Sequence, residues 1–148
     1  MDEIIEIKLK IIHDGKPPKK MSSGAVGYDI FARLDNHRVL KPGERAAIPA
    51  GFAIELPESF EAQIRPRSGL AINHGITMLN SPGTIDSDYR GEVKVIIINL
   101  GQKPVTIQNG DRIAQMIVTR TTNTKIRIVE NLFDTQRGKD GFGSTGSK

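Results

Sequence analysis

The stretch Asn80-Ser-Pro-Gly-Thr-Ile-Asp-Ser-Asp-Tyr-Arg-Gly-Glu-Val-Lys-Val95 joins turn-forming residues to the start of an apolar strand. Its Pro82-Gly83 pair favours a turn, because proline fixes φ and glycine tolerates positive φ. Gly91 then interrupts the backbone before Val93–Ile98, a largely β-branched run that predicts a strand. The stretch therefore predicts a polar loop or hairpin at the edge of a rigid sheet.

The same stretch concentrates ionisable side chains between the turn and the strand. Asp86, Asp88, Arg90 and Glu92 place three acids and one base within seven residues. Catalytic side chains are commonly carried on loops that a rigid scaffold positions. A solvated hairpin with scattered charges has the same composition, and short motifs often match by chance. These residues alone support a catalytic loop and an ordinary surface hairpin about equally.

Length and composition indicate a single domain without cysteine. A chain of 148 residues most often forms one domain and buries roughly two-thirds of its unfolded surface. Aromatic residues make up only 5% and tryptophan is absent, so the core must be built from Ile, Val, Leu and Ala. The lack of cysteine excludes disulfides and thiolate metal sites, and it fits a reducing, cytoplasmic compartment.

Charge and hydropathy argue against membrane and nucleic-acid partners. No apolar stretch is long enough to span a bilayer, and the acidic, alternating N-terminus differs from a secretory signal peptide. The net charge of +4 suits an anionic ligand without requiring nucleic acid. The interleaved basic and aromatic residues that are typical of nucleic-acid binding are missing. We therefore expect no nucleic acid and no membrane as a partner.

Short apolar or alternating segments, separated by turn signals, make up most of the chain. Only Ser68–His74 has helical character, and Asn109-Gly110 is a strong hairpin signal. Many short strands with turn signals roughly every ten residues predict an all-β sandwich or barrel with one short helix at most. The expected strands are Ile4–Ile12, the apolar end of Met21–Ala32, Arg45–Leu56 with a break near Pro49–Gly51, Phe60–Ile64, Val93–Ile98, Val105–Ile107, Arg112–Thr119 and Lys125–Val129.

Two further segments carry groups that suit an anionic ligand. Arg65–Ala71 places two guanidiniums and a hydroxyl at the start of the short helix, where backbone N–H groups can bind phosphate. The tail Arg137–Gly146 combines a lone Phe142 with glycines and hydroxyl residues that can cradle a phosphate chain while the ring stacks on a base. Each segment has an ordinary alternative: a loop with a serine cap, and a disordered tail.

Two polar residues stand inside otherwise apolar segments. Asp29 begins a strand within Ala25–Ala32, which is typical of a capping or turn residue. Gln115 lies within Gly110–Val118, and a buried amide needs partners from the backbone or from a ligand. The three histidines lack the spacing of a metal site, so we expect them to be surface or structural residues.

Taken together and in order, five of these segments resemble the five motifs of the trimeric deoxyuridine triphosphate nucleotidohydrolases, or dUTPases. The phrases Gly-Thr-Ile-Asp-Ser-Asp-Tyr-Arg-Gly and Phe-Gly-Ser-Thr-Gly are specific in combination. The resemblance implies a jelly-roll-like β domain over residues 1–136 and a flexible C-terminal arm over residues 137–148. It also implies a homotrimer with active sites at subunit interfaces. The five segments are Ala25–Ala32, Arg65–Ala71, Asn80–Val95, Gly110–Val118 and Arg137–Gly146.

The implied reaction is hydrolysis of dUTP to dUMP and pyrophosphate, with Mg²⁺ on the triphosphate. It would limit uracil incorporation into DNA and supply dUMP for thymidylate synthesis. Asp86 matches the catalytic base that holds the attacking water and contacts the 3′-OH, and Asp29 would approach the ion at most through water. The residues implied to contact substrate are Arg67, Ser68, Gly69, Asn80, Thr84, Ile85, Asp86, Tyr89, Lys94, Gln115, Arg137, Phe142, Gly143, Ser144 and Thr145.

The resemblance also implies how the base and the sugar are selected. Asn80 and neighbouring backbone groups would read the uracil edge, and a tight hairpin would exclude the C5 substituent of thymine. Tyr89 would pack where a 2′-OH would lie, Lys94 matches a further substrate contact, and Phe142 would close over the base.

Two other classes of protein share some of these features. A dCTP deaminase has a related fold, although all five motifs together favour the hydrolase. A trimeric β-sandwich that merely holds an anion is the alternative outside catalysis. Release of pyrophosphate from dUTP distinguishes all three.

Overall fold

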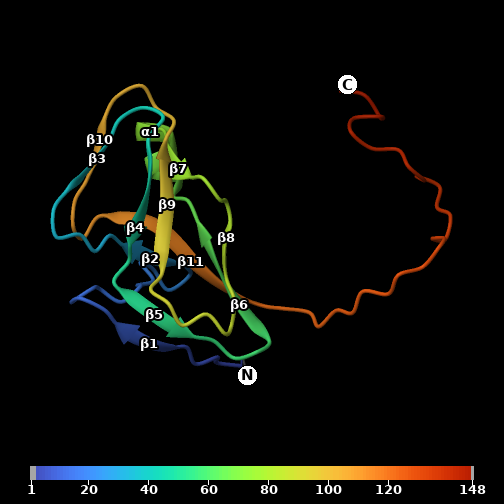
Figure 1. The fold of residues 1–148 in the computed structure, drawn as a ribbon, viewed down its shortest axis with the longest axis horizontal. Coiled ribbons are helices and arrows are strands. Elements are labelled where there is room, and N and C mark those ends of the chain that lie inside the picture. Colours follow the sequence, from blue (N-terminus) through green and yellow to red (C-terminus); the bar gives the residue numbers. More distant parts are fainter. Residues whose placement is uncertain (1–2, 148) are drawn as a thin grey trace.

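The computed structural model describes residues 3–147, which form eleven strands and one helix (Figure 1). This confirms the expected all-β class with one short helix. No helix in residues 3–147 is long and apolar enough to cross a membrane. The elements are β1 (Lys8–Ile11), β2 (Tyr28–Phe31), β3 (Arg38–Leu40), β4 (Arg45–Pro49), β5 (Phe52–Glu55), β6 (Phe60–Arg65), α1 (Ser68–His74), β7 (Ile76–Met78), β8 (Gly83–Ile85), β9 (Lys94–Asn99), β10 (Val105–Ile107) and β11 (Arg112–Arg120).

The strands pair into four antiparallel sheets that enclose one core. The two larger sheets have the strand orders β2-β11-β6-β8 and β4-β9-β7, and the two smaller ones pair β1 with β5 and β10 with β3. In Figure 1, β11 crosses behind the line of β4 and β9. All four sheets contribute buried side chains to the same cluster, among them Leu40, Phe52, Ile64, Ile97 and Met116. The core is mainly aliphatic, as expected, with Phe52 and methionines added.

Asn99 is the one buried polar side chain among the described residues, and its amide is fully bonded. Its Nδ2 donates to the carbonyls of Leu40 at 2.9 Å and Lys103 at 2.8 Å. Its Oδ1 accepts the N–H of Gly101 at 2.9 Å. A buried amide with both ends paired avoids the cost of an unsatisfied polar group. Asn99 therefore fastens the loop after β9 to the end of β3.

The Asn109-Gly110 pair forms a turn, but the hairpin prediction is wrong. β10 pairs with β3, whereas β11 pairs with β2 and β6. The turn bonds to the chain after β2: the Gly110 N–H donates to the Ala32 carbonyl at 2.8 Å, and the Asn109 Oδ1 accepts the Leu34 N–H at 2.9 Å. The Gly110 N–H and the Asn109 side chain thus bond to the segment after β2, and the two flanking strands lie in different sheets.

The strand predicted for Lys125–Val129 is also wrong for this chain. No strand follows β11 within the described residues, and Ile126 and Ile128 are 92% and 96% exposed. From Thr121 to Ser147 every residue is exposed except the half-buried Gly141. Figure 1 shows this tail leaving the body. The alternating pattern is present, but the folded chain offers it no neighbouring strand to pair with.

Candidate active site

The central stretch, Asn80–Val95, connects the two larger sheets, so the loop interpretation holds and the hairpin one does not. β8 pairs with β6 in the four-stranded sheet, whereas β9 pairs with β4 and β7 in the three-stranded sheet. The Tyr89 N–H donates to the Asp86 carbonyl at 3.2 Å and closes a turn between the strands. The loop that carries Asp86 is therefore anchored to one sheet at each end.

A cavity of about 340 Å³ opens beside this loop. Asp86, Tyr89 and Lys94 line it together with Thr84 and Ile85, so five of the predicted residues meet there. Asp86 is exposed, and its carboxylate makes no hydrogen bond or ion pair within residues 3–147. A free carboxylate and an ammonium at the mouth of one cavity can hold a water and an anionic group. Asn80 is exposed but is not among the residues lining this cavity.

Tyr89 is held against its own loop. Its hydroxyl donates to the Glu92 carbonyl at 3.1 Å, although the residue is 46% exposed. Gly91 leaves room for the ring, since a Cβ built there would lie 2.4 Å from the Tyr89 hydroxyl oxygen. The sequence interpretation took Gly91 as a break in the backbone and Glu92 as one of the clustered acids, and it missed their contacts with Tyr89. The only signal available was their position two and three residues after Tyr89.

The predicted phosphate segment lies at the start of α1, whose observed bounds match the prediction. Arg67 is the extended residue before the helix, with φ −101° and ψ 131° and no side-chain cap. Its Nη1 donates to the Arg112 carbonyl at 3.0 Å. Ser68 and Gly69 are exposed in the first turn, and a Cβ at Gly69 would contact nothing within 4 Å. The backbone here is open to a ligand.

The C-terminal end of α1 is fixed by two close-packed glycines. Gly75 ends the helix at φ +68° and donates its N–H to the Ala71 carbonyl at 2.9 Å. A Cβ at Gly75 would lie 2.5 Å from the Gly101 nitrogen. The left-handed conformation and the close approach both require glycine. Gly101 is itself bonded to Asn99, so the helix is seated on the loop after β9.

Gln115 is half-buried on β11, and the backbone supplies its partner. Its Nε2 donates to the Pro66 carbonyl at 3.1 Å, which places the amide beside the segment leading into α1. Gln115 lies opposite Arg65 on β6 and opposite Asp29 on β2. A Cβ at Gly27 would come within 2.9 Å of its Oε1. The amide is therefore oriented by its surroundings.

Asp29 forms an ion pair that the sequence interpretation missed. Its Oδ2 lies 3.1 Å from the Arg112 Nη1, with the two side chains 17% and 42% exposed. The carbonyl of Arg112 also accepts the Arg67 guanidinium. Arg67 and Arg112 line a second cavity of about 510 Å³ between α1 and β10–β11. Arg112 begins the predicted strand within the Gly110–Val118 segment, but nothing in that segment identified Asp29 as its partner.

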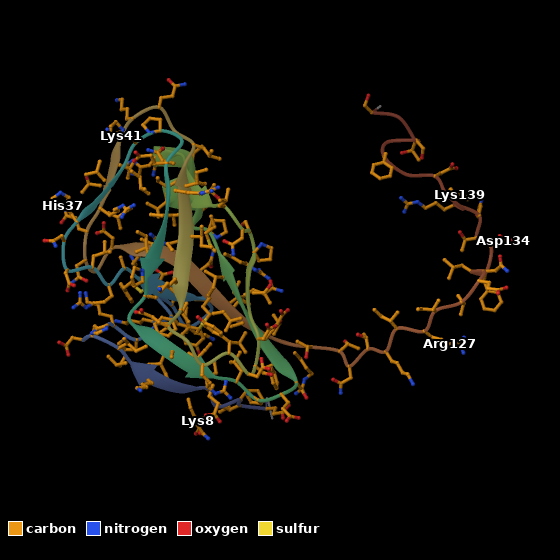
Figure 2. All side chains as sticks on the ribbon, viewed as in Figure 1. Lys8, His37, Lys41, Arg127, Asp134 and Lys139 are labelled. Carbon is orange, nitrogen blue, oxygen red and sulfur yellow. The ribbon has the colours of Figure 1, made fainter. Side chains whose placement is uncertain are left out.

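The predicted tail residues form a third group. Arg137, Phe142, Gly143, Ser144 and Thr145 line a hollow of about 850 Å³ made by the tail itself. The Arg137 Nε donates to the Asp140 carbonyl at 2.8 Å, and the Ser144 N–H donates to the Gly141 carbonyl at 3.0 Å. Figure 2 shows the tail side chains, including the labelled Asp134 and Lys139, standing apart from the body.

The predicted site residues thus gather in three groups within one chain. The cavity beside Asp86 and the one beside Arg67 share no lining residue in the described part of the chain, and the tail lines neither. No cluster of three or more His, Cys, Asp or Glu side chains suited to a metal ion occurs in residues 3–147. In the described chain these groups therefore lie at three separate places.

Comparisons with known proteins identify the family of this chain. The dUTPase family model matches residues 13–146. The deoxyuridine 5′-triphosphate nucleotidohydrolase of Caldanaerobacter subterraneus subsp. tengcongensis is 54% identical over 145 residues, which cover 96% of this chain and 98% of that protein.

Two solved structures show the same fold at low sequence identity. The dUTPase of Staphylococcus bacteriophage 80alpha, solved with dUPNHPP, has a TM-score of 0.87 at 24% identity and covers 95% of this chain and 98% of its own. A mutant of the phage phi11 dUTPase of S. aureus, described with a structural Mg(II) ion, has a TM-score of 0.78 at 21% identity. The match covers 85% of this chain and 97% of that one. With the family model spanning nearly the whole chain, the chain belongs to the dUTPase family, the enzymes that hydrolyse deoxyuridine 5′-triphosphate.

Proposed function

We propose that this chain converts dUTP to dUMP and pyrophosphate by attack of a water, held by Asp86, on the α-phosphorus. The observation that carries the proposal is the free Asp86 carboxylate at the mouth of a cavity that Tyr89 and Lys94 also line. A carboxylate accepts a proton from a positioned water as the water attacks, and pyrophosphate leaves from the opposite side. Alignment and charge stabilisation lower most of the barrier in such reactions.

The phosphate chain would be held by the groups around α1 and by the tail. Arg67, the open backbone at Ser68 and Gly69, and the oriented amide of Gln115 present donors from one region of the body. Donors of this kind stabilise charge that grows on phosphate oxygens. Arg137 would clamp the γ-phosphate, with Ser144, Thr145 and the Gly143 backbone adding further donors from the tail.

The nucleoside would occupy the cavity beside Asp86. Asn80 and the backbone at Thr84 and Ile85 would read the uracil edge, and Tyr89 would cover the face of the deoxyribose. Lys94 also lines this cavity, and Phe142, fully exposed in the tail, is free to close over the base. A narrow cavity that leaves no space for an added group selects against thymine and ribose by exclusion.

We infer a homotrimer in which each active site combines groups from different subunits. Support comes from the separation of the three groups in one chain and from the uncovered apolar side chains of the tail, including Ile126, Ile128 and Phe133. A chain that exposes such residues gains by burying them on a second copy. In a closed ring of three identical chains, each chain can cover a surface of one neighbour while its own surface is covered by the other.

Mg²⁺ fits the residues present as an ion held mainly by the substrate. No cluster of three potential ligands exists in residues 3–147, and the Asp29 carboxylate is already paired with Arg112. Mg²⁺ keeps waters and binds phosphate oxygens, so few protein ligands are needed. When bound, it would neutralise charge on the triphosphate, and Asp29 would approach it at most through water. The cysteine-free composition supports a cytoplasmic location, where the enzyme would limit uracil in DNA and supply dUMP.

The test is pyrophosphate release by wild type and by Asp86→Asn. Asparagine keeps the size of the side chain but cannot accept the proton, so kcat on dUTP should fall by about 10²–10⁴-fold while dUTP still binds. Wild type should act on dUTP in preference to dCTP, dTTP and UTP. Asp88→Asn, on the same loop, is the matched control and should retain activity. If Asp86→Asn stays within about threefold of wild type, Asp86 is not the general base.

A further inference from the structure

The ring of Tyr89 is fitted over Gly91 with no room to spare. A Cβ at Gly91 would lie 2.4 Å from the Tyr89 hydroxyl oxygen, 2.6 Å from Cζ and 2.9 Å from Cε2. The φ angle of Gly91 lies outside the left-handed region, so its backbone accepts an ordinary L side chain. A larger residue at position 91 would therefore require the Tyr89 ring to move, whereas the main chain itself would accept one.

Glu92 fastens the same ring to the body. Its carbonyl accepts the Tyr89 hydroxyl at 3.1 Å, and its Oε2 accepts the Gly51 N–H at 3.1 Å. The next residue, Val93, makes backbone hydrogen bonds of 2.9 Å with Phe52 and Ala50. The acceptor of the Tyr89 hydroxyl is thus held by both a side chain and a strand.

Gly51 is a rigid anchor for that side chain. It is buried, adopts φ +74°, and a Cβ built on it would lie 2.6 Å from the Gly15 Cα. Its carbonyl accepts the Ile12 N–H at 2.8 Å. Because its backbone has no freedom to follow a moving partner, the bond from Gly51 to Glu92 fixes the loop relative to β1 and β5.

We propose that Gly91 and Glu92 are positioning residues that seat the Tyr89 ring and thereby set the discrimination between deoxyribose and ribose. This rests on the proposed role of Tyr89 in covering the sugar. The Tyr89 ring can exclude a 2′-OH only if it does not rotate away from the sugar. An exposed tyrosine on a loop has several rotamers open to it, and the hydrogen bond from its hydroxyl to the Glu92 carbonyl, across the space left by Gly91, favours the observed one. Gly91 leaves the space that the ring occupies. The Glu92 carbonyl accepts the Tyr89 hydroxyl, and the Glu92 carboxylate accepts the Gly51 N–H.

The first two variants test separately the space above Gly91 and the hydrogen bond of the Tyr89 hydroxyl. In Gly91→Ala the added methyl displaces the ring, and the preference for dUTP over UTP in kcat/KM should fall roughly tenfold, part of the ~100-fold that rejection of an added hydroxyl can supply. In Tyr89→Phe the ring stays but its tether is lost, and the preference should fall roughly two- to tenfold, the worth of one neutral hydrogen bond. Gly24→Ala is the control, since a Cβ at Gly24 meets nothing within 4 Å.

The second pair tests the carboxylate of Glu92. Glu92→Ala removes the acceptor for the Gly51 N–H and should lower the preference by roughly threefold. Glu92→Gln keeps an acceptor oxygen of the same reach and should restore the preference to within about twofold of wild type. Thermal unfolding of each variant accompanies the kinetics. A purely structural role would lower the unfolding temperature and the rates on both nucleotides together, without moving their ratio.

Tyr89→Ala separates this inference from the proposed function. If Tyr89→Ala lowers the dUTP preference while Gly91→Ala and Tyr89→Phe both leave it unchanged, Tyr89 keeps its proposed role. The positioning role of Gly91 and Glu92 is then refuted. If Tyr89→Ala also leaves the preference unchanged, the role of Tyr89 itself falls. The proposal is supported if the preference for dUTP over UTP falls in Gly91→Ala and Tyr89→Phe. It must also fall in Glu92→Ala and stay near wild type in Glu92→Gln.

Discussion

Residues 3–120 and residues 121–147 contain the same kinds of side chain in opposite surroundings. β1, Lys-Leu-Lys-Ile, and the tail segment Lys125–Val129, Lys-Ile-Arg-Ile-Val, alternate in nearly the same way. β1 pairs with β5, and its Leu9 and Ile11 are 37% and 43% exposed. In the tail, Ile126 and Ile128 are more than nine-tenths exposed. An alternating pattern gives a segment the capacity to pair, and the available neighbour decides whether it does.

The contrast also separates what holds the body together from what the tail contributes. The body has a continuous core drawn from four sheets, whereas the described tail buries none of its large apolar side chains. Ordering such a segment costs conformational entropy that only a ligand or a second chain can offset. The body should therefore fold without the tail's contacts, and the tail should gain order only in a complete site.

The largest difference should appear when the same substitution is made in both regions. Phe52 is fully buried and Phe142 fully exposed. Phe52→Ala should lower the free energy of unfolding by about 3–5 kcal/mol, because it removes a large core side chain and leaves a cavity. Phe142→Ala should change it by less than about 0.5 kcal/mol in the absence of nucleotide.

Chemical denaturation of both variants and wild type, at one protein concentration, measures this difference. Phe142→Ala should instead raise KM for dUTP, because the ring would close over the base. Comparable losses of unfolding free energy in the two variants would mean that the tail is packed in the unliganded protein. The contrast between body and tail would then be wrong.

An intermediate effect is expected from mixing two inactive parents. One parent carries Asp86→Asn with an intact tail, and the other keeps Asp86 but ends before Arg137. If the loop and the tail at one site come from different subunits, random co-refolding should make about a quarter of sites active in a closed ring. Pyrophosphate release from the mixture, against each parent refolded alone, measures the recovery.

The control for this experiment is mass spectrometry of the mixture, which verifies that mixed trimers form. Mixed trimers with no more activity than the parents would place the loop and the tail of each site in the same subunit. That result would remove the shared-site assembly and leave the chemistry of Asp86 untouched.

The smallest effect should be seen in the tail alone. Amides after Gln136 should exchange rapidly with solvent in the free protein and more slowly with a non-hydrolysable dUTP analogue, because the segment has too little buried apolar surface to remain ordered by itself. Hydrogen exchange with and without the analogue follows this, with the core strand β9 as the internal reference. Equal protection of the tail in both states would argue against a closing arm.

Local chemistry made several elements of the fold predictable. α1 was bounded correctly because Pro66 precedes it and Gly75 ends it, and the break between β4 and β5 follows from Pro49 and Gly51. The three short strands β3, β7 and β8 were not predicted as separate strands. Each has only three residues, too few to show a period; β10 is as short, but its Val-Thr-Ile sequence is β-branched throughout. The pairing partners of β10 and β11 depended on bonds to a distant segment, which no local pattern contains.

The candidate site could be predicted in its members but not in its arrangement. The motif resemblance supplied Asp86, Tyr89 and Lys94, which do line one cavity. It did not supply the Asp29–Arg112 ion pair, because that contact joins β2 to β11 across 83 positions of sequence. Nor did it supply the contacts that hold Tyr89, which depend on the space above Gly91 and on the Glu92 carbonyl. Gly91 is visible in the sequence, but which ring fills the space above it, and which carbonyl accepts the Tyr89 hydroxyl, are not.

The loop between β8 and β9 has a consequence for how this protein can be altered. One end of the loop follows the four-stranded sheet and the other the three-stranded sheet, so the spacing between the sheets sets where Asp86 stands. Repacked cores often keep their stability while the sheets shift slightly, and a displacement of about 1 Å at a reacting group can cost about 100-fold in rate. The packing of Ile85, Val93 and Val95 in the core therefore bears on the position of Asp86 as well as on stability. An engineer who enlarges this core for thermal tolerance would also be moving the Asp86 carboxylate, the proposed general base.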